Sequence, residues 1–125
     1  MKKLLILLFS LLISLNSYGE WTEISESNVG DTYYLDLDSI KENNGYVYFW
    51  TLMDSAKPNI FGDLSSKVLT EAICNVPYKE RGIEWHYYKL PMGQGSPDSN
   101  NVIGFWNYPS PGDVREAILE FVCEY

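Results

Sequence analysis

The chain contains few residue types that could carry out chemistry. It has one histidine, His86, and two cysteines, Cys74 and Cys123. Acid–base or nucleophilic catalysis by His86 would require a serine or cysteine oriented by the imidazole. No serine of the sequence has the flanking glycines of a nucleophile elbow. We therefore expect His86 to be a half-buried strand residue and the protein not to be an enzyme. Haem ligation by His86 or a neighbouring tyrosine is an alternative, which only the aromatic neighbours of His86 favour.

Two close pairs of oxygen donors are the candidates for a metal site. They are Asp36 with Asp38, and Asp98 with Asn100. Calcium takes roughly six to eight oxygen ligands, and neither pair continues into the calcium-loop pattern with its distal glutamate. The glycines of Gly93-Gln94-Gly95 form too short a run to cradle a phosphate, and no helical pattern follows them. We expect no metal and no cofactor.

The N-terminus has the pattern of a secretory signal. Two lysines precede an apolar run from Leu4 to Leu15, which is shorter than the ~20 residues of a membrane span. Small residues at the −3 and −1 positions predict cleavage between Gly19 and Glu20. The sequence thus predicts a signal peptide at residues 1–19 and one exported domain at residues 20–125. With no cysteine at the cleavage site, we expect a protein that is not a lipoprotein, in the periplasm or at the outer surface of a bacterium.

The charge balance excludes several classes of partner. The whole chain carries −8, and loss of its two N-terminal lysines with the signal lowers this to −10. An acidic chain cannot neutralise phosphates and is repelled by anionic lipid headgroups. We expect no nucleic-acid partner, and after residue 20 no run is long and apolar enough to span a membrane.

Export also changes the meaning of the two cysteines. In an oxidising compartment an even pair predicts a disulfide, whereas a redox pair normally has C-x-x-C spacing. A Cys74–Cys123 bond closes a loop of about 50 residues, for which the chain-entropy estimate is about 4 kcal/mol.

Hydrophobic periodicity predicts strands followed by one helix. We expect strands at residues 21–25, 32–37, 46–53, 66–75, 83–90 and 102–108. Asn44-Gly45 between two β-prone runs predicts a hairpin turn. Ser110 is the predicted N-cap of the helix, with Pro111 at its first position. The predicted fold is a single α+β domain with an antiparallel sheet of about five to six strands. Its C-terminal helix would pack on one face, tethered by the disulfide.

One strand poses a packing problem. The run Tyr46–Met53 is apolar on both faces, while a single short helix covers only one. Loops, a second copy of the chain or a ligand must cover the other face.

A series of short motifs runs through the whole exported chain in a characteristic order. They are Trp21, Tyr33-Tyr34-Leu35-Asp36, Ser39-Ile40, Gly45, Trp50, Ser65-Ser66-Lys67, Glu71, Cys74, Pro91-Met92-Gly93, Gly95, Trp106, Pro111-Gly112 and Val122-Cys123. In these residues and their order the chain resembles the surface-adhesin protein E family of Gram-negative bacteria. The resemblance implies an antiparallel sheet with a disulfide-held C-terminal helix on its concave side, and a homodimer. It also implies cell-surface binding of host matrix and plasma glycoproteins such as vitronectin and laminin.

We therefore expect an exported, non-enzymatic binding or adhesion domain whose partner is a host glycoprotein or an envelope protein. The alternative is a periplasmic protein that binds a small aromatic or haem-like ligand on its sheet, or an envelope accessory protein. Abundant tyrosine and tryptophan suit both, because these side chains bury a large area and keep a polar group.

Overall fold

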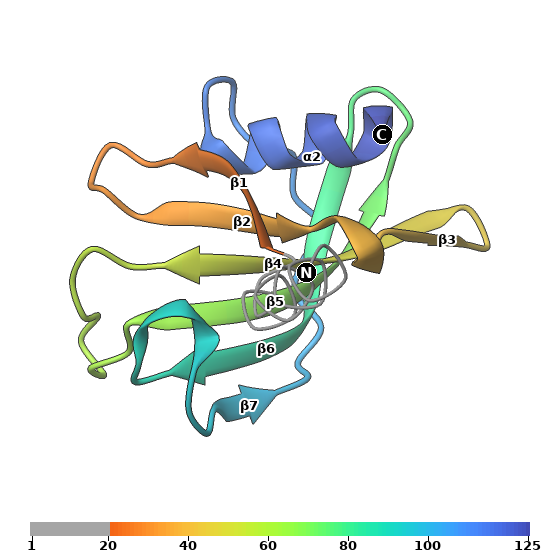
Figure 1. Cartoon of the computed structure of the whole chain (residues 1–125). Helices are drawn as coiled ribbons and strands as arrows, with labels where there is room; N and C mark the ends of the chain where they lie inside the picture. The colour runs from red at the N-terminus through yellow and green to blue at the C-terminus, as the bar shows by residue number, and fades with distance from the viewer. Residues whose placement is uncertain (1–20) are drawn as a thin grey trace, which may run out of the picture.

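The computed structural model describes residues 21–125, in which seven strands and one α-helix form an α+β domain (Figure 1). The strands are β1 Trp21–Glu26, β2 Thr32–Asp36, β3 Lys41–Asn43, β4 Tyr46–Asp54, β5 Ser65–Ile73, β6 Lys79–Tyr88 and β7 Asp98–Asn100. The helices are α2 Val114–Glu124 and two single 3-10 turns, η1 Leu37–Ser39 and η2 Pro91–Gly93. The sheet is antiparallel throughout, in the order β1-β2-β4-β5-β6-β7, with β3 paired to β4. The predicted fold class is confirmed.

The β3–β4 hairpin forms where the Asn-Gly pair predicted it. Asn44 has φ 53° and Gly45 has φ 84°, so both turn residues are left-handed. Such a turn matches the twist of the strands that it joins.

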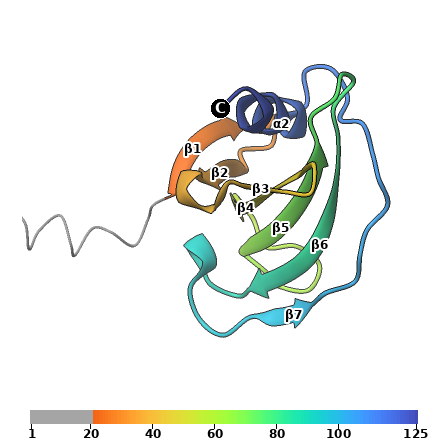
Figure 2. The ribbon, with the colours of Figure 1, turned by 90° about the vertical axis from the view of Figure 1, so that its right-hand side faces the viewer.

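The core lies between α2 and one face of the sheet, here called the helix face. Leu35, Phe49 and Ala72 are fully buried on this face. They pack against Ile118, Leu119 and Val122 of the helix, which are also buried. Figure 2 shows α2 end-on, lying across the β1 end of a strongly curved sheet. Because the helix is short, it covers only part of its own face.

The disulfide joins this helix to the sheet as predicted. Cys74 directly follows β5, Cys123 lies in the last turn of α2, and their Cα atoms are 5.4 Å apart. Among residues 21–125 no helix is long and apolar enough to cross a membrane.

The opposite surface of the sheet, here called the far face, is covered in part by the η2 turn. Met92 donates its backbone N–H to Asp54 Oδ1 (2.8 Å), and Gly93 donates to Ser65 Oγ (2.8 Å). Leu52 beneath this turn is fully buried. A loop therefore covers part of the second apolar face of β4, which is one of the three possibilities that the sequence left open.

The predicted last strand, 102–108, is wrong. β7 lies earlier, at Asp98–Asn100, and within 102–108 only Asn107 forms a bridge, to Glu80. The alternation of apolar residues was misleading because this segment is an outer edge, where Phe105 is 95% exposed.

The predicted helix start is also wrong, because Asp113 and not Ser110 is the N-cap. Its carboxylate accepts from the Arg115 N–H (3.3 Å). Gly112 has φ 83°, a left-handed conformation that prevents the helix from beginning earlier.

Candidate binding groove

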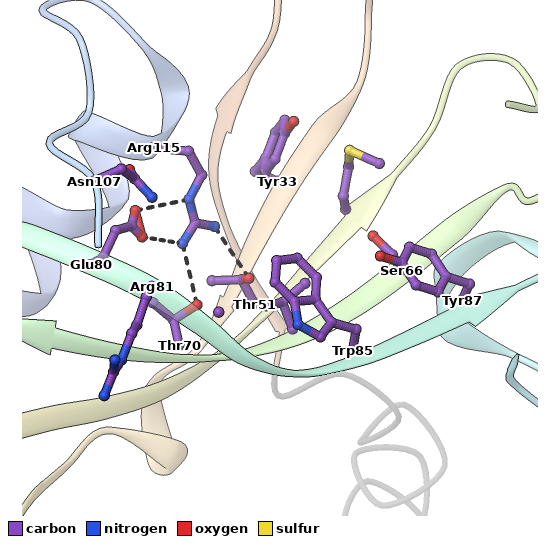
Figure 3. A pocket seen from close by; sticks show the side chains of 13 residues that line it. Tyr33, Thr51, Ser66, Thr70, Glu80, Arg81, Trp85, Tyr87, Asn107 and Arg115 are labelled. Atoms are coloured by element: carbon purple, nitrogen blue, oxygen red, sulfur yellow. Dashed lines mark hydrogen bonds and ion pairs between the residues drawn. The ribbon is translucent and has the colours of Figure 1, made fainter. Parts of the chain in front are cut away.

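The part of the helix face that α2 leaves open forms a groove, which we call the helix-face groove. The antiparallel register builds its floor in two rows. One row crosses four strands as Tyr33, Met53, Ser66 and Tyr87; the other crosses three as Thr51, Val68 and Trp85. The cavity has a volume of about 370 Å³ (Figure 3). Most of its floor is apolar or aromatic, as in sites that bind through buried area.

Trp85 forms one wall of the groove, and two contacts fix its indole ring. The ring N–H donates to the carbonyl of Val102 (2.9 Å). Three atoms of the ring lie within 2.9 Å of the place where a Cβ on Gly82 would be, so a side chain at this position would collide with the indole. A β-bulge follows Gly82, since Thr70 pairs with Gly82 and Leu69 with Glu84. The glycine and the bulge together place the indole against the sheet instead of over the groove.

An ion pair closes the end of the groove nearest the helix. Arg115 of α2 donates from Nε to Glu80 Oε1 (3.0 Å) and from Nη2 to Glu80 Oε2 (2.5 Å). The same guanidinium reaches the hydroxyls of Thr51 (3.3 Å) and Thr70 (3.4 Å), as Figure 3 shows. The Glu80 side chain is only 4% exposed. Both charges are thus paired. Arg81, which also lines the groove, is paired with Glu71 (2.7 Å), so the groove presents little net charge.

Tyr33 supplies a polar group at the side of the groove. Burial, and next the nearby Asp31 carboxylate, raise the pKa of its phenol above the ordinary value of 10.0. A tyrosine phenol is neutral near pH 7 even without this shift, and the Tyr33 hydroxyl can donate a hydrogen bond to a ligand.

His86 lies on the far face, away from this groove. Its side chain is 22% exposed, which confirms the expected half-buried strand histidine. Nδ1 lies 2.5 Å from Ser99 Oγ, and Nε2 lies 3.1 Å from Glu84 Oε1. Sequence reasoning missed Ser99 because the exposed polar residues 98–100 have the composition of a loop and lie outside the predicted strands. His86 and Ser99 are direct partners in the β6–β7 ladder.

These three residue types also occur in hydrolytic triads, but their placement here differs. Ser99 lies within a short exposed strand, whereas the nucleophilic serine of an α/β-hydrolase is held on a sharp turn between a strand and a helix. We interpret the Ser99–His86 contact as a cross-strand bond that fixes β7 to β6.

The candidate metal donors take part in local backbone contacts. Asp36 caps η1 by accepting from the Asp38 N–H (3.1 Å), and Asn100 accepts from the Val102 N–H (3.2 Å). Within residues 21–125 no three His, Cys, Asp or Glu side chains gather in a way that could hold a metal ion.

The fold and the groove define a small sheet domain with a disulfide-tethered helix that offers an open, largely apolar surface. The family model described as surface-adhesin protein E matches residues 21–124, and the chain belongs to this family.

Among solved structures, the chain is similar to Haemophilus influenzae protein E. The TM-score is 0.66, the sequence identity is 15%, and the match covers 87% of each chain. This likeness supports the shared fold. The comparison with curated protein sequences finds no match.

Proposed function

We propose that this protein is an exported, non-enzymatic adhesin that binds a protein ligand through its helix-face groove. The observation that carries the proposal is the unfilled half of the helix face. Tyr33, Met53, Val68 and Trp85 line a cavity there that the chain's own helix leaves open. Partly exposed aromatic and aliphatic side chains in a concave site are the usual anchors of a protein interface.

Family membership supports the adhesive role, since the family is that of a surface adhesin. The finer proposal is that the ligand is a host matrix or plasma glycoprotein, of which vitronectin and laminin are the first to test. Each would be immobilised, and binding of the 20–125 protein measured by biolayer interferometry. Saturable binding supports the proposal, and absence of binding to both refutes this choice of ligand.

Two adjacent residues of β5 provide a matched pair of variants. Val68 lines the helix-face groove, while Leu69, also half-buried, lies on the far face. We expect Val68→Gln to weaken binding about tenfold or more, and Leu69→Gln to leave it within about twofold. Equal losses in the two variants would contradict a role for the groove.

Export is the second part of the proposal. The predicted signal peptide, including the Gly19–Glu20 cleavage site, lies outside the described residues. The Cys74–Cys123 bond supports export, because disulfides persist in oxidising compartments. N-terminal sequencing of the protein from cell fractions tests this part; a chain that begins at Glu20 in the periplasm or at the outer surface is expected. Surface accessibility to added protease then separates display from retention in the periplasm.

A free small ligand is a second candidate occupant of the same groove. A volume of about 370 Å³ falls at the lower end of the range of small-molecule sites. Titration with apolar and aromatic compounds, haem included, would change the fluorescence of Trp85 if such a ligand binds. An unchanged signal, compared with a Trp85→Phe control, would refute this alternative.

The homodimer implied by the family resemblance stays a prediction. Light scattering coupled to size exclusion tests it directly.

A further inference from the structure

A second groove runs along the outer side of α2, and we call it the α2 groove. Its lining residues belong to the helix, to the β5–β6 connection and to the chain that leads into the helix. Figure 2 shows these three segments close together. Its apolar residues are Val76, Pro77, Tyr78, Tyr108, Pro109 and Leu119, and its volume is about 350 Å³. Tyr108 is 60% exposed and Val76 is 85% exposed, so the groove presents apolar surface to solvent.

Three glutamates of α2 form the acidic wall of this groove. Glu116, Glu120 and Glu124 all line it and follow one another at intervals of four residues. At a rise of about 1.5 Å per residue, successive carboxylates are about 6 Å apart along the helix. The wall is therefore a row of three negative charges beside an apolar floor.

This row is unfavourable for the helix itself. The four ion pairs within the described part of the chain involve other carboxylates, and the last turn of α2 has no basic residue. Like charges four residues apart on a helix repel each other, and Glu124 lies near the negative end of the helix dipole. Glu116 gains one compensating contact, from the Gly112 N–H (3.1 Å). Folding alone does not favour the placement of Glu120 and Glu124.

We propose that the α2 groove binds an extended basic segment of a partner protein, in which lysine or arginine alternates with an apolar residue. In an extended chain, alternate residues are about 6.6 to 6.8 Å apart, close to the spacing of the glutamates. The basic side chains meet the acidic wall, and the apolar side chains enter the floor between Pro77 and Tyr108. Charge complementarity identifies the occupant, since neither a second copy of a chain of charge −8 nor an anionic lipid surface would be attracted.

This inference goes beyond the proposed function and is independent of it. None of the residues that line the α2 groove lines the helix-face groove. Variants of one groove therefore leave the other intact, and the two proposals can fail separately.

The test uses a fluorescent synthetic peptide, acetyl-Gly-Lys-Leu-Lys-Leu-Lys-Gly-amide, titrated with the 20–125 protein at about 50 mM salt, where screening is weak. A triple variant that combines Glu116→Gln, Glu120→Gln and Glu124→Gln is compared with wild type. The amide oxygen introduced by Glu116→Gln can still accept from the Gly112 N–H, so the helix start is retained. We expect the triple variant to bind about tenfold more weakly or worse.

A second triple variant is the matched control. It combines Glu23→Gln, Glu26→Gln and Glu42→Gln, all at exposed positions of the sheet, and makes the same change in net charge. We expect less than about twofold loss from this control. Equal losses in both triple variants would show that only net charge matters and would overturn the proposal.

The apolar floor is tested with a second peptide in which serine replaces both leucines. We expect it to bind about fivefold more weakly or worse, and Tyr108→Ser to weaken binding of the leucine peptide by a similar factor. If the serine peptide binds as tightly as the leucine peptide, or if wild type binds neither, the proposal is refuted. Circular dichroism spectra that match wild type confirm that each variant is folded.

Discussion

Replacing Arg115 by methionine should destabilise the domain strongly. The substitution keeps much of the side-chain volume but leaves the Glu80 carboxylate, 4% exposed, without its cationic partner. Removing one partner of a buried ion pair typically costs about 3 to 5 kcal/mol. Because the Arg115 side chain is itself 28% exposed and water can enter at that point, we expect the lower end, about 3 kcal/mol.

Thermal and guanidinium unfolding followed by circular dichroism measure this loss. For a domain of this size, about 3 kcal/mol lowers Tm by roughly 10 to 20 °C. The double variant Arg115→Met with Glu80→Met removes both charges, and we expect it to recover most of the lost stability.

A loss below about 1 kcal/mol in Arg115→Met would refute the reasoning, because the pair would then behave like a solvent-exposed one. A double variant as unstable as the single one would contradict the claim that an unpaired buried charge is the cause.

Three further predictions follow from other parts of the structure. Gly82→Ala should push the Trp85 indole into the helix-face groove and weaken ligand binding about tenfold, while the control Leu69→Gln does not change it. Unchanged affinity together with unchanged tryptophan fluorescence would contradict the packing of Trp85 against Gly82. Cys74→Ser combined with Cys123→Ser should lower the free energy of unfolding by about 4 kcal/mol, measured by urea unfolding against the oxidised wild-type protein. A loss under about 1 kcal/mol would contradict a stabilising role of the disulfide. The Lys89 ammonium lies 2.8 Å from the Asp63 carboxylate and lowers the pKa of that carboxyl group. The ionised Asp63 therefore stabilises the fold at pH values above the ordinary pKa of aspartate, and this contribution disappears as the pH falls through the lower pKa of the folded state. Lys89→Met should raise that pKa in an NMR titration and reduce Tm near pH 7 but not near pH 2; an unmoved pKa would refute this assignment.

Local patterns in the sequence predicted much of the fold. The Asn44-Gly45 turn, the doubly apolar strand β4 and the cysteine pair each depend on a few neighbouring residues or on one pairing choice. Alternation along the predicted strand 66–75 places Val68 and Leu69 on opposite faces, as they lie in β5. These features are set by strand periodicity and turn chemistry, which the sequence displays directly.

The groove could not be predicted, because its parts are distant in sequence. Arg115 and Glu80 are 35 residues apart, and neither sequence neighbourhood indicates a buried pair. The strand β7 was missed because its three exposed polar residues have the composition of a loop. The predicted strand 83–90 begins after Gly82, whereas this glycine lies within β6, where it makes room for an indole three residues later.

The central claim is that a protein ligand binds in the helix-face groove, and fluorine NMR of the tryptophans tests it most directly. Incorporated 5-fluorotryptophan reports on Trp85 in the groove, on Trp50 beside His86 on the far face, and on Trp106 against Arg81. Single Trp→Phe variants assign the signals. On addition of a glycoprotein that binds, we predict that the Trp85 signal shifts or broadens while that of Trp50 stays in place. A response at Trp50 with an unchanged Trp85 signal would contradict the account.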